Sequence, residues 1–277
     1  MSTLSDSEID VIIPCLNSSS TIERALNSLR RQTNQNFSII LVDDGSTDGT
    51  VQIAEEYANR FHLSLNVIRH EKNQGTSSAM NDGVKASSKE WVTFLGSDDE
   101  LTEDWLDAML SVISKVKGYD LYACTAYLVE PDGSAKHYKE GMSSREVFLS
   151  DIYVRNTILS SGCFVKKQMF EKLGGFTVGM YNEDYDLWMR ALASGYRIFE
   201  EVNPLYLYYI GGPGQVTANQ RRIVVSSTEA RLRLIKSGHL QERDVKGFRK
   251  GICICWRDLL IFEKSQKLRK KFQRICL

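Results

Sequence analysis

The sequence predicts an α/β fold built on a mixed, mainly parallel sheet with helices on its faces. Apolar runs typical of buried strands alternate with helical patterns across the first hundred residues, as in a doubly wound sheet. Two acidic clusters, Asp43-Asp44 and Ser97-Asp98-Asp99, directly follow two of these runs. Because the carboxyl ends of parallel strands share one crevice, we expect both clusters to line a single ligand site from neighbouring strands.

In chain order, the first half contains strand 9–14, a helix opened by the capping-box pair Ser20 and Glu23, strand 37–42, a helix capped by Thr47 or Asp48, strand 63–68, helix 76–86 and strand 91–95. Apolar side chains at helical or strand spacing support each assignment. A helix from about residue 103 to 115 follows, then strand 121–129 and a hairpin partner at 135–138, strand 160–165, a short helix ending at Gly174-Gly175, helix 183–193 and a helical, basic end.

Composition restricts the partners. The 277 residues include 35 basic and 35 acidic side chains, so no net field attracts nucleic acid, and we expect no nucleic-acid partner. The six cysteines lack the spacing of a zinc site or a disulfide framework. The start resembles no signal peptide, and no apolar run approaches the roughly 18 residues of a membrane span. We therefore expect a cytoplasmic protein.

The acidic clusters have two interpretations each. Asp43-Asp44 precedes a glycine and suits a turn, yet an ionised aspartate also accepts hydrogen bonds from a nucleobase or a ribose hydroxyl. Ser97-Asp98-Asp99 suits a turn too, but carboxylates are ligands for Mg²⁺ or Mn²⁺ shared with substrate phosphates. The turn 14–18 lacks the glycine-rich loop of dinucleotide-binding proteins.

A third acidic pair, Glu183-Asp184, begins a predicted helix. Acidic residues stabilise a helix N-terminus, which explains the pair without function. The same helix dipole is expected to keep Asp184 ionised, as a general base requires.

In this order the motifs resemble the inverting family 2 glycosyltransferases, which have the GT-A fold. The resemblance runs from about residue 9 to 217 and rests on the segments 12–17, 29–33, 42–50 (Val-Asp-Asp-Gly-Ser-Thr-Asp-Gly-Thr), 73–75, 81–83, 94–99, 173–176 and 183–190 (Glu-Asp-Tyr-Asp-Leu-Trp-Met-Arg). It implies transfer of a sugar from a nucleotide-diphosphate donor, with a UDP-sugar expected, to a hydroxyl of a saccharide or polyprenyl-linked acceptor in bacterial-type surface polysaccharide assembly.

The resemblance also implies residue roles. Asp99 would bind the divalent metal, Mn²⁺ or Mg²⁺, and Asp184 would be the catalytic base. The acceptor side would include Asn182, Glu183 and Trp188, although Trp188 also suits a core position. The residues that would bind the nucleotide and donor are Pro14, Leu16, Asn17, Asp43, Asp44, Asn73, Gly75, Asn81, Ser97 and Asp98.

The chain departs from the family pattern near the diphosphate. Gly96 replaces a frequent additional aspartate, and the segment 79–81 lacks a frequent arginine. The late segment reads Tyr209, Gly211 and Gly212 where many relatives have arginine and histidine. The cations that remain as candidates for this role are Lys85, Arg221 and Arg222.

We therefore expect a polar tail at 1–8, a glycosyltransferase domain at 9–217 and a helical, basic extension at 218–277. Within the domain, residues 9–100 form the donor half and 101–217 the acceptor half. In the extension, Ile261, Leu268, Phe272 and Ile275 recur at helical spacing among basic residues. This pattern suits either peripheral contact with the inner face of an anionic membrane or packing on protein.

Two other functions fit parts of the sequence. A sugar-nucleotide-binding module without catalysis would need only the first two acidic clusters. A nucleotidyltransferase also uses metal-bound carboxylates, but it usually has a glycine-rich or basic phosphate loop. The sequence does not identify the oligomeric state.

Overall fold

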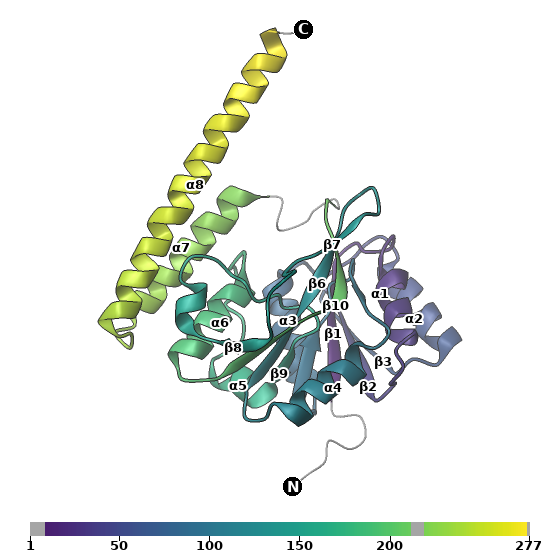
Figure 1. Cartoon of the computed structure of the whole chain (residues 1–277). Helices are drawn as coiled ribbons and strands as arrows, with labels where there is room; N and C mark the ends of the chain where they lie inside the picture. Colours follow the sequence, from purple (N-terminus) through teal and green to yellow (C-terminus); the bar gives the residue numbers. More distant parts are fainter. Residues whose placement is uncertain (1–8, 212–218, 276–277) are drawn as a thin grey trace.

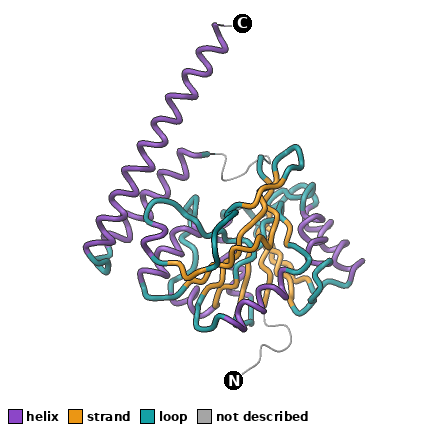
Figure 2. Tube along the Cα trace, viewed as in Figure 1, coloured by secondary structure: helices purple, strands orange, loops and turns teal. Residues whose placement is uncertain are grey.

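The chain forms one mixed sheet with helices on both faces, seen in the computed structural model, which describes residues 9–211 and 219–275 (Figures 1 and 2). The strand order within these residues is β3-β2-β1-β4-β9-β6-β10-β5, with β7 beside β6 and β8 beside β10. The predicted mixed α/β sheet is confirmed.

The first half is a parallel unit. Its elements are β1 (Ile9–Cys15), α1 (Ile22–Arg30), β2 (Phe37–Asp43), α2 (Thr50–Phe61), β3 (Leu65–Arg69), α3 (Thr76–Ala86) and β4 (Trp91–Phe94). β1 pairs in parallel with β2 on one side and with β4 on the other. Their carboxyl ends therefore lie at the same edge of the sheet. β2 and β4 are not adjacent, so the expectation of neighbouring strands was wrong: β1 separates them.

The second half mixes strand directions. It comprises β5 (Glu100–Leu101), α4 (Trp105–Lys115), β6 (Leu121–Val129), β7 (Ala135–His137), β8 (Arg145–Val147), the 3-10 helix η1 (Leu149–Ile152), β9 (Phe164–Lys166), α5 (Lys167–Lys172), α6 (Glu183–Ala193), β10 (Ile198–Tyr209), α7 (Gln220–Lys236) and α8 (Glu242–Ile275). β9 runs antiparallel to both β4 and β6 and joins the two halves.

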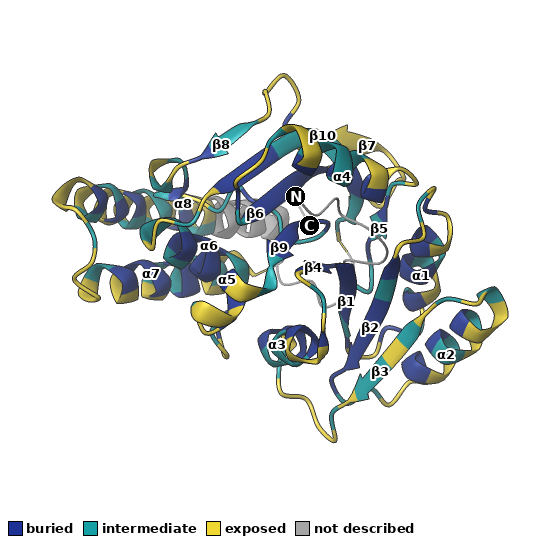
Figure 3. Cartoon of the chain, turned by 90° about the horizontal axis from the view of Figure 1, so that it is seen from below, coloured by how far each residue is buried: buried dark blue, intermediate teal, exposed yellow. Residues whose placement is uncertain are grey.

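Two hydrophobic layers enclose the sheet (Figure 3). Residues of α1, α2 and α4 pack on one face. Residues of α3, α5 and α6 pack on the other, and α7 and α8 extend that layer. Alternate side chains of β1 serve both layers, because Val11 lies in one cluster and Ile12 in the other. Burial on both faces explains why the parallel strands are continuous apolar runs.

Three local predictions need correction. The N-cap of α1 is Thr21, with no side-chain capping bond, so Ser20 and Glu23 form no capping box. The N-cap of α2 is Gly49, although the Asp48 carboxylate does accept a hydrogen bond from the Thr50 amide at 3.1 Å. The strand expected at 160–165 begins only at Phe164, because Gly162 adopts a left-handed φ of 74°.

The C-terminal helices lie beside α6, and α8 continues well past the end of α7 and away from the sheet (Figure 1). Its first half is anchored, since Phe248 is fully buried and its ring packs edge-on against Tyr153 at 4.9 Å. Farther along, Leu260, Ile261 and Phe262 are exposed by 62%, 62% and 48%. No helix in the described ranges combines the length and hydropathy that crossing a bilayer requires.

Candidate functional site

The turn after β1 lies between the two acidic clusters and contacts both. Asn17 has a left-handed φ of 51°, its amide donates to Ser46 Oγ at 2.8 Å, and its Oδ1 accepts from the Thr47 amide at 2.9 Å. Ser18 Oγ lies 2.8 Å from Ser97 Oγ. The turn therefore connects the loops that follow β2 and β4, and Ser97 is fixed within that connection.

The apolar residues of this turn differ in exposure. Pro14 pairs with Val42 in the sheet and is half-buried. Leu16 is 39% exposed. An exposed apolar surface at this edge suits the flat face of a nucleobase.

Asp44 is buried and surrounded by donors. Its Oδ1 accepts from the amide of Gln74 at 2.8 Å and lies 2.8 Å from His70 Nδ1, while its Oδ2 accepts from the amide of Gly75 at 2.8 Å. The other His70 nitrogen lies 3.2 Å from Asp82. Asp44 thus holds the loop before α3, a role that sequence reasoning missed. His70 was missed as well, because no local motif marks it.

Asp43 and Asn73 also hold loop backbone. Asp43 Oδ1 accepts from the Ser46 amide at 3.1 Å, which shapes the Gly45 turn. Asn73 Oδ1 accepts from the Gly75 amide at 2.9 Å, where φ is 93°. These contacts agree with the turn interpretation of both motifs and leave the predicted nucleotide contacts untested.

Asp98 and Asp99 converge on Gly96. A Cβ at Gly96 would lie 3.0 Å from both Asp98 Oδ1 and Asp99 Oδ2. Asp99 is buried and its Oδ1 accepts from the Tyr209 amide at 3.1 Å. Burial, and secondly the charge of Asp98, raise the pKa of Asp99 well above its ordinary value. The glycine that departs from the family pattern is therefore what gives both carboxylates room to converge.

A cation that sequence reasoning missed lies beside this pair. The Arg24 guanidinium, from α1, sits 3.7 Å from the Tyr209 ring centroid and donates to the Asp98 carbonyl. Its buried Nε has no hydrogen-bond partner but lies 4.0 Å from the Glu100 carboxylate, with which Arg24 forms an ion pair. Arg24 is better placed for an anionic ligand than Lys85, an exposed residue in the last turn of α3. In the sequence, only its position in the first turn of the first helix could have indicated it.

The residues present suit a divalent cation shared with a ligand. No group of three or more His, Cys, Asp or Glu side chains that could hold a metal occurs among the described residues. Mg²⁺, however, usually binds through one or two carboxylates and completes its shell with water and substrate phosphates. Asp99, with Asp98 beside it, provides such a partial set, and a cation there would offset the cost of burying the Asp99 charge.

Asn81 connects the two halves of the chain. Its Nδ2 donates to the Phe176 carbonyl at 2.9 Å and its Oδ1 accepts from the Phe176 amide at 2.8 Å. Gly175 must be a glycine, since its φ is 72° and a Cβ would lie 2.6 Å from Asn81 Oδ1. Both ends of the Asn81 amide are thus engaged by backbone, which gives this residue a structural role in positioning the loop before α6.

The Glu183-Asp184 pair lies at the start of α6. Asp184 Oδ2 accepts from Asn156 Nδ2 at 2.8 Å, and its Oδ1 accepts from the Tyr185 amide at 2.7 Å. Burial raises the pKa of both carboxyls, and the Asp184 charge raises that of Glu183 further, while the two donors limit the rise at Asp184. Burial raises the pKa of Asp184 to about 6, so the carboxyl can still be ionised at neutral pH, and the expectation of an ionised Asp184 stays a prediction.

The other two predicted acceptor-side residues, Asn182 and Trp188, lie in different surroundings. Asn182 donates to Ser227 Oγ of α7 at 2.6 Å, and its buried Oδ1 has no partner. Trp188 is fully buried and packs edge-on against Phe176. The predicted acceptor contact of Trp188 is wrong, because the helical period turns this side chain from the start of α6 into the core.

Comparison with known proteins supports this description. Residues 10–174 match the family model described as "Glycosyl transferase family 2". A protein of Haemophilus influenzae named "Uncharacterized glycosyltransferase" is 28% identical over 66% of this chain and 62% of its own length. "Glycosyltransferase AglE" of Haloferax volcanii is 28% identical over 69% of this chain and 63% of its own length. The alignments thus cover about six-tenths of these relatives.

Solved structures share the fold. S. aureus TarS residues 1–349, crystallised with UDP-GlcNAc, superposes with a TM-score of 0.73 at 23% identity over 88% of this chain and 72% of that one. The mannosyltransferase PcManGT of Pyrobaculum calidifontis, in complex with GDP-Man and Mn²⁺, gives 0.66 at 15% identity over 98% of this chain and 83% of that one. The GT-A arrangement predicted from the motifs is confirmed.

Replacing Asp44 by Asn tests its role in the loop. The asparagine NH₂ group would face a backbone N-H that donates to a carboxylate oxygen in the wild type, and that N-H would lose its acceptor. We therefore expect the free energy of unfolding to fall by about 2 kcal/mol in urea titrations. Asp82→Asn is the matched control, because its carboxyl also contacts His70 but is 46% exposed. We expect a change below about 0.5 kcal/mol there. Equal effects of the two substitutions would show that Asp44 does not hold the loop.

Proposed function

Because the chain belongs to glycosyl transferase family 2, we propose that it transfers a sugar from a nucleotide-diphosphate donor to an acceptor hydroxyl, with a divalent metal and with inversion. The observation that carries this proposal is the half-buried Glu183-Asp184 pair, in which two donors stabilise the ionised form of Asp184. A module that only binds nucleotide has no need of such a pair.

The donor would occupy the edge where the loops after β1, β2 and β4 meet. Leu16 offers an exposed apolar surface to the base, and Asp43 and Asp44 lie beside Cys15, the residue before Leu16. A UDP-sugar is the first donor to test, since the structurally similar TarS was crystallised with UDP-GlcNAc. We assign Asn17, Asn73, Gly75 and Ser97 to the shape of this site and Asp98 to the ribose or the sugar.

Arg24 and Asp99 would handle the diphosphate. When bound at Asp99, Mn²⁺ or Mg²⁺ supplies positive charge for the departing nucleoside diphosphate. The Arg24 guanidinium lies beside the same pair of carboxylates and offers N-H donors to phosphate oxygens. This arrangement takes the place of the arginine and histidine that the family pattern usually has.

The acceptor hydroxyl would be deprotonated by Asp184. As its oxygen forms a bond to the anomeric carbon, its proton passes to an Asp184 oxygen, and the bond from that carbon to the diphosphate oxygen breaks. One displacement inverts the anomeric centre. Glu183 keeps its proton when Asp184 is ionised, because desolvation, and secondly the charge of Asp184, raise its pKa to about 8.

The far end of α8 would contact an anionic membrane surface. Residues 264–277 include six basic and no acidic side chains, so the remaining 263 residues carry 29 basic and 35 acidic ones. The formal net charge of the whole chain is zero, but residues 264–277 are strongly basic. The exposed Leu260, Ile261 and Phe262 precede it on a helix that leaves the domain. Such a combination suits a lipid-linked saccharide acceptor and a place in surface polysaccharide assembly.

Asp184→Asn tests the base. We expect transfer and hydrolysis of the donor to fall about 10²- to 10⁴-fold, while thermal stabilisation by UDP-GlcNAc with Mn²⁺ persists. Glu183→Gln is the comparison, since glutamine resembles the protonated acid, and its loss is expected to stay within about tenfold. Near-normal transfer by Asp184→Asn would exclude this base. A wild-type protein that binds the donor but forms no product would instead be a binding module.

The pH profile tests the contact from Asn156. Its N-H stabilises the ionised Asp184, so Asn156→Ala should raise the Asp184 pKa and move the acidic limb of kcat/KM to higher pH by about one unit. Asn156→Asp keeps the shape but adds a like charge, and should move the limb further. We therefore expect the acidic limb to lie at the lowest pH in the wild type, at higher pH in Asn156→Ala and at the highest pH in Asn156→Asp. A purely structural defect would not produce this order. A limb that stays in place in both would contradict the assignment.

Flotation with liposomes tests α8. We expect the full chain to bind vesicles with about 30% phosphatidylglycerol in phosphatidylcholine and to dissociate as salt is raised, because each basic residue near the surface contributes about 1 kcal/mol. Removal of residues 264–277 should abolish binding and leave thermal stabilisation by UDP-GlcNAc unchanged. Binding unaffected by the truncation would exclude the membrane role of this end.

A further inference from the structure

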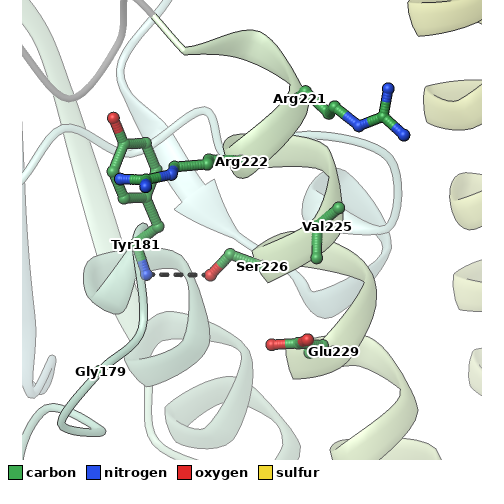
Figure 4. Close-up of a pocket in the computed structure, with 7 residues that line it drawn as sticks. All are labelled: Gly179, Tyr181, Arg221, Arg222, Val225, Ser226 and Glu229. Carbon is green, nitrogen blue, oxygen red and sulfur yellow. Dashed lines mark hydrogen bonds between the residues drawn. The ribbon is translucent and has the colours of Figure 1, made fainter.

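A pocket of about 380 Å³ lies between the loop that precedes α6 and the first half of α7 (Figure 4). The residues that give it its chemistry are Tyr181 from the loop and Arg222, Ser226 and Glu229 from α7. Its volume is within the range of small-ligand sites. Among the described residues, the lining comes from the loop before α6 and from α7 and includes none of the residues that form the donor edge.

One end of the pocket is cationic. The Arg222 guanidinium faces the Tyr181 ring, 5.7 Å from its centroid. Within the ranges that the structure describes, Arg222 forms no ion pair with a carboxylate. The neighbouring Arg221 points away from Tyr181 and lies 3.2 Å from Glu263 of α8. Arg222 is therefore the cation available to an anionic group, and the ring limits its movement.

The other end is acidic. Glu229 follows Arg222 by seven residues on the same helix, which is about two turns or roughly 10 Å along the axis. It too forms no ion pair within the described ranges. An ionised carboxylate only accepts hydrogen bonds, so it suits hydroxyl groups. A ligand that satisfies both ends needs an anion on one side and hydroxyls on the other.

The pocket is fixed beside the proposed base. Ser226 Oγ accepts from the Tyr181 amide at 3.0 Å, and Ser227 Oγ accepts from Asn182 at 2.6 Å. These two bonds attach α7 to the residues that directly precede Glu183-Asp184. A ligand between Arg222 and Glu229 would therefore lie on the acceptor side of the enzyme.

We propose that this pocket binds a glycosyl phosphate, with the phosphate on Arg222 and sugar hydroxyls toward Glu229. The inference rests on the proposed function, because the ligand would be the phosphate-bearing part of the acceptor. The same chemistry occurs in a free sugar phosphate and in a polyprenyl-linked one. The position of the arginine pair also favours a lipid source, since Arg221 joins α7 to α8 just where α8 leaves the domain.

Calorimetric titration of the full chain with glucose 1-phosphate tests the pocket and needs no turnover. Binding is therefore measured independently of transfer, and either result can occur whether or not the protein transfers a sugar. We expect binding that saturating UDP and Mn²⁺ do not prevent, and that methyl glucoside does not reproduce. Arg222→Gln should weaken it by about tenfold or more, with Arg222→Lys in between, because a bidentate contact to phosphate is lost.

Arg60→Gln is the matched control. Arg60 also lies over an aromatic ring, 5.1 Å from that of Phe61, but on α2 at the other side of the molecule. It should bind glucose 1-phosphate as the wild type does. Displacement by UDP would assign the sugar phosphate to the donor edge and overturn the proposal. Equal affinity of wild type and Arg222→Gln, or no binding at all, would overturn it as well.

A second titration series distinguishes the sources. A short-chain polyprenyl-phosphate sugar in detergent is compared with glucose 1-phosphate. Tighter binding by about tenfold or more assigns the lipid-linked form, and equal binding assigns a free sugar phosphate. In either case Arg222→Gln must weaken binding for the proposal to stand.

Discussion

The parallel register of β1 between β2 and β4 is the constraint on which the site depends. The register pairs Cys15 with Asp43 and Ile12 with Phe94, so three loops begin at one edge of the sheet. The loops that follow β1, β2 and β4 lie next to one another at that edge, so they can form hydrogen bonds directly. Asn17 and Ser18 provide these bonds, and the rest of the donor edge is arranged around them.

Local donors account for most of the acidic residues at that edge. Asp43 and Asp44 accept hydrogen bonds from backbone amides, and these bonds offset the cost of removing the two carboxylates from water without a ligand. Asp99 differs, because a single amide contact does not keep its pKa from rising. The electrostatic need for a cation is therefore concentrated at one carboxylate of the four. Both clusters suit turns in the sequence, but only the second contains a carboxyl whose pKa burial raises well above its ordinary value.

The elements of the first half could be predicted because both faces of the sheet are buried there, whereas β10 and its partners β5 and β8 were missed. Continuous apolar strands and amphipathic helices then leave a clear periodic pattern, and β6 was predicted from Leu121 to Val129 as observed. Contacts between distant loops leave no such pattern. Arg24 near Tyr209 and His70 between two aspartates depend on side chains far apart in the chain, and were missed. Trp188 suited both a core and an acceptor position in the sequence, and the structure buries it in the core.

Residues from both halves of the chain and from α7 hold the Glu183-Asp184 pair in place. Two neighbouring carboxyls that are hard to ionise together share one negative charge over a range of pH, and the donors to Asp184 direct that charge to it. The start of α6 is held in place from three directions: by Asn156, by the Ser226 and Ser227 hydroxyls of α7, and through Phe176 by Asn81 of the first half. The proposed base is thus positioned by both halves and by α7, so we expect a change in α7 to alter the position of Asp184 without contacting the donor edge.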